Sequence, residues 1–145
     1  METTISKKFL ELCDGLLRGE ISAVETYDIA IKKFEKAQAI TELSEIRSGH
    51  QESVTKLRSH IQSLGGTPST DSGAWGTFAT AVEKAASLLG DTSAVTALIQ
   101  GEEYGIGEYE SSLEGTDLSD GTRTLISEEL LPKLHRNLEA LEHLK

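Results

Sequence analysis

The sequence predicts an all-α protein, a four-helix bundle with an additional short helix in the connection between the second and third long helices. The chain contains only two prolines, and its longest stretches lack the apolar–polar alternation that is typical of strands. In the first long stretch, apolar residues recur at steps of three and four, as on the buried face of a helix. These residues are Phe9, Cys13, Leu16, Val24, Tyr27, Ile31 and Phe34. The 145 residues are expected to form one domain, 1–145, large enough to bury a core.

The first two long helices are expected to be neighbours in the chain. The first is predicted over about residues 3–37, where Thr3 or Thr4 can cap its first turn. The second begins within residues 38–41 and ends at residue 64, because two glycines, at positions 65 and 66, then stop a helix. The two helices should form an antiparallel hairpin.

The connection that follows contains the most loop-like stretch of the chain. Residues 67–73 are rich in Ser, Thr, Pro and Gly, and a short helix is predicted over residues 73–89, with Trp75 as a packing anchor. Gly90 should end this helix. The connection is long enough to travel the length of the bundle, in which case the second and third long helices are parallel. If it folds back locally, the bundle is plain up-down-up-down.

Two further long helices complete the predicted bundle as a second hairpin. They are expected over about residues 93–113 and 120–144. Pro132 lies inside the last one, where it removes a backbone hydrogen bond and should kink the helix, freeing the carbonyl of Glu128. The predicted inward stripe of the last helix is Leu125, Glu128, Leu131, His135, Leu138 and Leu141.

Each predicted helix carries a polar residue on its apolar stripe, within about one turn of the helix midpoint. These residues are Glu20, His50, Glu102, Glu128 and His135. A buried carboxylate costs several kcal/mol unless it is paired, so these residues are expected to meet in one layer. Tyr27 and Tyr109 could border this layer and donate hydrogen bonds to carboxylates. Glu52 and Glu103 are alternates, because a small rotation of either helix would change which side chain points inward.

Charge and composition exclude several classes of function. The formal net charge of −10 disfavours nucleic acid and anionic membrane surfaces as partners. Cys13 is the only cysteine, so it cannot form an internal disulfide, and its place on the apolar stripe predicts a core residue. Nothing resembles a signal peptide or a membrane-spanning run, so a cytoplasmic protein is expected. The width of the first helix's apolar face leaves a homodimer through helix faces as an option.

Mid-bundle carboxylates and imidazoles are typical of ferritin-like di-iron proteins. Residues 20–27 (Glu-Ile-Ser-Ala-Val-Glu-Thr-Tyr) resemble the helix-A segment of bacterioferritins, where the Glu is a ligand and the Tyr lies beside the site. The whole chain is more similar to an uncharacterised bacterial family of ferritin-like four-helix bundles, a domain of unknown function. The similar segments are residues 20–27, His50 before 64–66, 72–78, 101–104 with Tyr109, and 130–135. The resemblance implies a ferritin-like fold and no assigned activity.

The sequence departs from the di-iron pattern in a way that bears on function. Ferritin-like sites use Glu-x-x-His on two helices, but Arg47 precedes His50 by three residues and Pro132 precedes His135 by three. We therefore expect a non-enzymatic structural or interaction protein with a buried Glu/His/Tyr layer, a stress-related role being left open.

The alternative is a metal-binding or ferroxidase-type protein. Its ligands to iron, manganese or zinc would be Glu20, His50, Glu102 and His135, with Tyr27, Tyr109 and Glu128 around them.

Overall fold

A computed structural model describes residues 7–115 and 118–145, and every regular element within these ranges is helical. The predicted cap at Thr3 or Thr4 lies outside the described residues, as does the side chain of Trp75. The elements are α1 (Lys7–Lys33), α2 (Ala37–Ser63), the 3₁₀ turn η1 (Gly73–Gly76), α3 (Thr77–Leu89), α4 (Asp91–Glu114), α5 (Asp120–Leu125), the π-helical turn η2 (Ile126–Leu130) and α6 (Leu131–Leu144). The predicted all-α class is confirmed. No helix in the described part of the chain is both long and apolar enough to cross a membrane.

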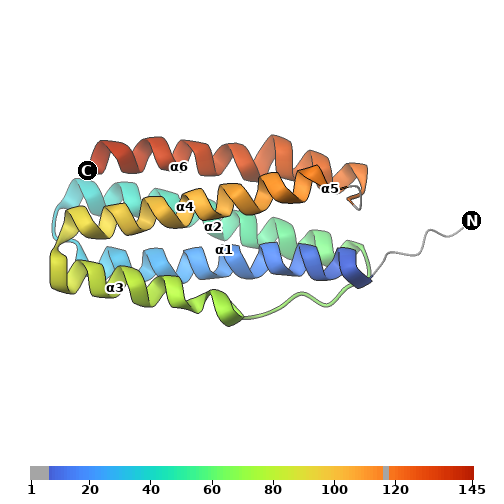
Figure 1. Ribbon diagram of the computed structural model, residues 1–145, viewed down its shortest axis with the longest axis horizontal. Helices are drawn as coiled ribbons and strands as arrows, with labels where there is room; N and C mark the ends of the chain where they lie inside the picture. The colour runs from blue at the N-terminus through green and yellow to red at the C-terminus, as the bar shows by residue number, and fades with distance from the viewer. Residues whose placement is uncertain (1–6, 116–117) are drawn as a thin grey trace, which may run out of the picture.

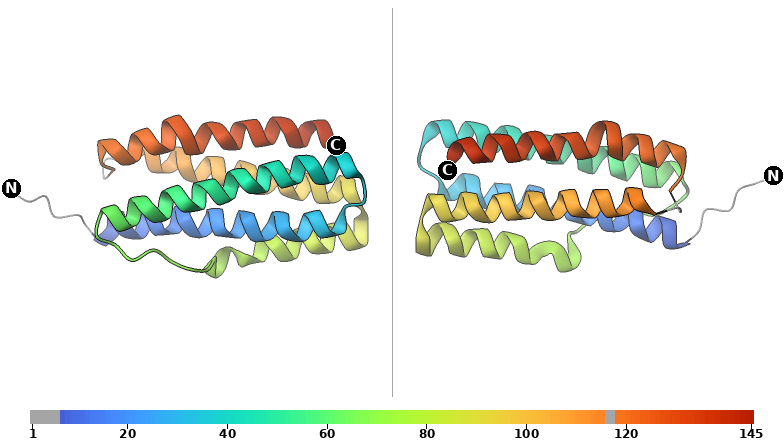
Figure 2. Two further views of the ribbon diagram at one scale, coloured as in Figure 1. Left: turned by 180° about the vertical axis from the view of Figure 1, so that it is seen from behind. Right: turned by 45° about the horizontal axis from the view of Figure 1, so that its top comes forward.

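The helices form two antiparallel hairpins, α1 with α2 and α4 with the α5–α6 segment (Figure 1). The connection after α2 runs back along the molecule, so α2 and α4 point in the same direction (Figures 1 and 2). Within this connection α3 packs against both α1 and α4. Of the two connections that the sequence allowed, the structure therefore has the long crossover.

The connection between α2 and α3 is attached to α1 by polar contacts at Ser69. Asp14 accepts hydrogen bonds from the backbone N–H of Ser69 at 2.8 Å and from its hydroxyl at 2.5 Å. Arg18 donates to the same hydroxyl oxygen at 2.9 Å. These contacts hold the loop beside α1 and set where α3 begins.

Two helix ends differ from the predicted ones. α1 ends at Lys33 rather than near residue 37, because buried Phe34 anchors the turn and Lys36 is extended, with φ −72° and ψ 123°. No glycine or proline marks this turn, so the apolar spacing in the sequence predicted a helix that extends past its observed end. α4 begins at Asp91, two residues early, since Gly90 turns the chain directly into it with φ 95°, a conformation that favours glycine.

The last helix is continuous from Asp120 to Leu144 as predicted, but it contains η2 just before Pro132. The N–H of Leu131 bonds to the carbonyl of Ile126, five residues back, as in a π-helix. Proline lacks an N–H and lies in the first turn of α6, where this loss is tolerated. The predicted irregularity at Pro132 thus takes the form of a π-helical turn, which adds a residue to one turn of the helix.

Two hydrophobic clusters fill the bundle, and each takes a different part of α1. One contains Phe9, Cys13, Leu16, Leu17 and Val24, and the other contains Tyr27, Ala30 and Phe34. Cys13 is fully buried, so its predicted place in the core is confirmed, and burial raises the pKa of its thiol to about 11. The polar residues described next lie among these apolar side chains, where each must find a partner inside the protein.

Candidate functional site

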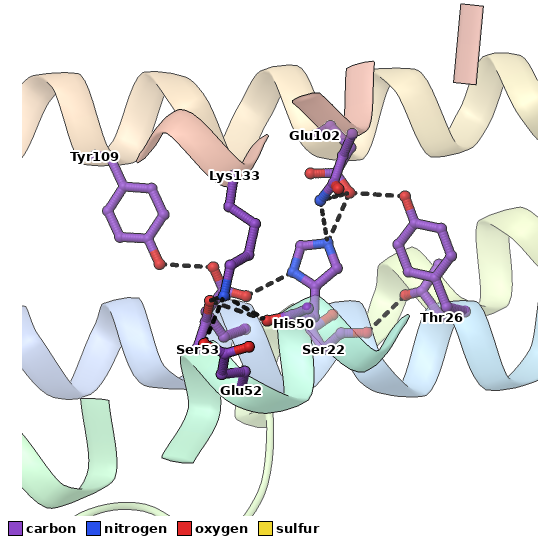
Figure 3. Close-up of polar contacts among 12 residues, drawn as sticks. Ser22, Thr26, His50, Glu52, Ser53, Glu102, Tyr109 and Lys133 are labelled. Carbon is purple, nitrogen blue, oxygen red and sulfur yellow. Dashed lines mark hydrogen bonds and ion pairs between the residues drawn. The ribbon is translucent and has the colours of Figure 1, made fainter. Parts of the chain in front are cut away.

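His50 lies at the centre of a buried polar layer in the middle of the bundle (Figure 3). Its Nδ1 is 2.6 Å from Oε2 of Glu20 on α1, and its Nε2 is 2.6 Å from Oε1 of Glu102 on α4. All three side chains are at least nine-tenths buried. A carboxylate only accepts, so an imidazole that contacts one through each nitrogen donates from both and carries a positive charge.

Two tyrosines complete the layer with reciprocal hydrogen bonds between α1 and α4. Tyr109 of α4 donates to Oε1 of Glu20 at 2.6 Å, while Tyr27 of α1 donates to Oε1 of Glu102 at 2.7 Å. The ring of Tyr27 also stacks on His50, with ring centres 5.4 Å apart. Each carboxylate is therefore held by the opposite helix.

The electrostatics of the layer follow from its burial and its charges. Burial alone would lower the pKa of His50, but the carboxylates of Glu102 and Glu20, through their charge and their hydrogen bonds, raise it to about 10. Burial and then the same carboxylates hold the pKa values of Tyr27 and Tyr109 well above the usual value of a phenol. At neutral pH the layer therefore contains an imidazolium ion and two neutral phenols.

The structure brings together five of the seven residues predicted for the site: Glu20, His50, Glu102, Tyr27 and Tyr109. The other two, His135 and Glu128, are exposed, and their predicted place in the layer is wrong. The alternates Glu52 and Glu103 are exposed as well. Thus α1, α2 and α4 supply the expected polar residue and the last helix does not.

In the last helix, two possible inward faces lie one residue apart along the sequence. Its inward residues are Thr122, Ile126, Leu130, Leu134, Asn137 and Leu141, at steps of four, four, four, three and four. The predicted stripe took Leu131 and His135 as inward, whereas the structure buries Leu130 and Leu134, one residue earlier in each case. Because leucines stand at both positions 130 and 131, each stripe fits helical spacing in the sequence, and only packing distinguishes them.

Asn137 is the layer residue that the sequence reading missed. It is buried on α6, and its side-chain amide lies 3.3 Å from Oε1 of Glu102 and 3.4 Å from Nε2 of His50. The signal was present in the sequence, since Leu134, Asn137 and Leu141 follow helical spacing. An asparagine amide supplies a hydrogen bond where a second histidine would supply a metal ligand.

The reciprocal hydrogen bonds between α1 and α4 rest on a local repeat. Gly19-Glu20 is followed by Tyr27, and Gly101-Glu102 is followed by Tyr109, so both helices read Gly-Glu-x₆-Tyr. Since α1 and α4 run antiparallel (Figure 1), this shared spacing places each Tyr opposite the other helix's Glu, as the two hydrogen bonds show. The repeat is visible when the sequences of the first and third long helices are aligned on their glutamates.

The layer as it stands does not fit a bound metal ion. His50 uses both ring nitrogens on carboxylates, so neither offers a lone pair to a metal. Within residues 7–115 and 118–145, no group of three or more His, Cys, Asp or Glu side chains is arranged to hold one. The chemistry that the arrangement does support is a buried, charged hydrogen-bond network.

A cavity of about 70 Å³ lies beside the layer, between α1, α3 and α4. Apolar and small side chains dominate its walls, with Phe78 and Val82 from α3. Glu20, Glu102 and His50 lie at its polar end. The layer is therefore reachable from one side of the bundle through a mostly apolar space.

Comparison with known families places the site in context. Residues 10–115 match the family described as "Domain of unknown function (DUF2383)". The match covers α1 from residue 10 onward, α2 and α4, and with them Glu20, His50 and Glu102, but it ends before α6 and Asn137. Neither a search of curated proteins nor a search of solved structures finds a match to the chain.

Proposed function

Since the chain belongs to the DUF2383 family, a domain of unknown function, we propose from its geometry that it is a non-enzymatic structural or interaction protein whose Glu/His/Tyr layer locks the helices in register. One observation carries this proposal: His50 of α2 bonds to Glu20 of α1 and to Glu102 of α4, each at 2.6 Å. A slide of any of these helices by one turn would separate a buried charge from its partner. Such a layer penalises every register but one.

The completeness of the network supports a structural role. No buried side-chain nitrogen or oxygen in the described part of the chain lacks a hydrogen-bond partner. Catalytic groups need a free atom directed at a substrate, whereas Glu20 uses both oxygens and both tyrosines use their hydroxyls within the layer. Lys133 adds to the lock by reaching from α6 to the carbonyl of Gly49 on α2 at 3.1 Å.

We further propose that the bundle is ferritin-like. Two antiparallel hairpins joined by a crossover that leaves α2 and α4 parallel support this assignment (Figure 2). The net charge of −10 supports a protein that binds neither nucleic acid nor anionic membrane surfaces, and we propose the cytoplasm as its location. Leu88 and Leu89, 78% and 74% exposed at the end of α3, offer an apolar contact for a homodimer or another partner.

A double-mutant cycle tests the shared layer. Glu20→Leu and Glu102→Leu should each lower the free energy of unfolding by about 3–5 kcal/mol, because each leaves a tyrosine and one nitrogen of His50 without an acceptor. The double variant should cost at least about 1 kcal/mol less than the sum of the two, measured by urea denaturation. Glu20→Leu combined with His135→Ala serves as the additive control. Additivity in the carboxylate pair would show that the two groups do not act together.

The second candidate is a metal-binding protein, and the convergence of two carboxylates and an imidazole from three helices favours it. Iron, manganese or zinc would take Glu20, His50 and Glu102, and not the exposed His135. His50 would first have to give up a proton and one of its carboxylate contacts.

Titration with ferrous, manganous and zinc ions separates the two candidates. We expect the melting temperature to stay constant up to millimolar metal, because a ligand raises it only if it binds the folded state. His135→Ala should behave like the wild type. A rise that survives His135→Ala and disappears in His50→Ala, together with metal in untagged purified protein, would replace the first proposal with the second.

A further inference from the structure

The cavity between α1, α3 and α4 has walls built from matched small residues. Relative to the layer glutamate of each helix, positions −5, −1 and +3 are small on both α1 and α4 and line the cavity. They are Gly15, Gly19 and Ala23 on α1, and Ala97, Gly101 and Gly105 on α4. Without these side chains, α1 and α4 leave about 70 Å³ of space, which is room for about two or three non-hydrogen atoms.

The charge of the lining selects the kind of occupant. Three carboxylates line the cavity, from Glu20, Glu102 and Glu108, and His50 is the basic group among its described lining residues. The formal charge of this set is negative whether His50 carries one ring proton or two. An anion is therefore repelled, and a small cation is favoured.

One carboxylate oxygen at the polar end has unused capacity. Oε1 of Glu102 accepts hydrogen bonds from Tyr27, His50 and Asn137, but no described residue donates to Oε2. Since every fully buried side-chain oxygen in the described part of the chain has a partner, Oε2 contacts accessible space although the Glu102 side chain is only 3% exposed. A carboxylate oxygen that is accessible and has no protein donor is free to accept a hydrogen bond from a molecule in the cavity beside it.

We propose that this cavity binds a small primary alkylammonium ion. Its ammonium group would donate to Oε2 of Glu102 in a charge-assisted hydrogen bond, and its one- or two-carbon chain would lie against Phe78 and Val82. The apolar walls exclude strongly hydrated metal ions from the outer part of the cavity, and its volume excludes bulky quaternary ammonium ions. The site uses an oxygen that takes no part in the hydrogen bonds between the helices, so fixing the helix register and binding the cation are compatible roles.

Titration with ethylammonium chloride, followed by NMR on isotope-labelled protein, tests the site directly. We expect saturable shifts of the Phe78 and Val82 resonances and nuclear Overhauser contacts from the ethyl protons to both side chains. Ethanol, tetramethylammonium chloride and sodium chloride at the same ionic strength should give no saturable change. Absence of the Overhauser contacts, or equally tight binding of ethanol, would overturn the proposal.

A pair of glycine substitutions gives a matched control that leaves the layer intact. A methyl group at Gly101 would enter the cavity in ordinary contact with Phe78, 3.8 Å away, so Gly101→Ala should fold and weaken ethylammonium binding at least tenfold. Gly107 is exposed on the same helix with nothing near its missing side chain, so Gly107→Ala should bind like the wild type. Equal affinities in the two variants would contradict a site in this cavity.

Discussion

Replacing His50 by leucine is expected to lower the free energy of unfolding by about 3–5 kcal/mol, because it leaves the buried carboxylates of Glu20 and Glu102 without their shared cation. Leucine is apolar and about as bulky as histidine, so the loss reports the charge network rather than a large cavity. Urea denaturation followed by circular dichroism measures it.

The matched control is His135→Leu, which makes the same chemical change at an exposed position of α6. It should alter the free energy of unfolding by no more than about 0.5 kcal/mol. Equal effects of the two substitutions would show that His50 contributes nothing through its carboxylate contacts. The comparison also checks the register of α6, since the predicted stripe placed His135 in the layer.

Raising the pH above neutrality is expected to destabilise the protein progressively. The pKa of His50 is about 10 in the folded protein and near 6.5 in an unfolded chain, so the folded state binds more protons between these values. The stabilisation is therefore complete below about pH 6.5 and is lost as the pH rises towards 10, at up to about 1.4 kcal/mol per pH unit. The raised pKa values of Tyr27 and Tyr109 extend the loss to higher pH, with the same sign.

Unfolding free energies measured from pH 6 to pH 10 in the wild type, His50→Leu and His135→Leu test this dependence. Between pH 7 and pH 8.5, below the range in which Cys13 and the tyrosines contribute, the slope should disappear in His50→Leu and persist in His135→Leu. A wild type that is equally stable at pH 7 and pH 9.5 would contradict a buried imidazolium at the centre of the layer. NMR titration of the His50 ring assigns the proton independently.

The local sequence pattern was sufficient to predict most of the helices and the polar-layer residues that α1, α2 and α4 contribute. A carboxylate or imidazole in an otherwise apolar stripe has a large burial cost, so Glu20, His50 and Glu102 had to find partners, and the structure pairs them with one another. Helix ends with a glycine signal, such as the one before Gly65, were also predictable. The end of α1 was not, because buried Phe34 rather than a turn residue stops it.

The sequence by itself determined that this protein is helical, that the middle of its bundle is polar, and that it carries no Glu-x-x-His motif, because these follow from periodicity and from residue types at fixed spacing. Only the tertiary structure decided the crossover between α2 and α4, since the direction of a long connection depends on packing between distant elements. It also decided that Asn137 rather than His135 faces His50, because the last helix carries two possible apolar stripes one residue apart and only packing against the other helices selects between them.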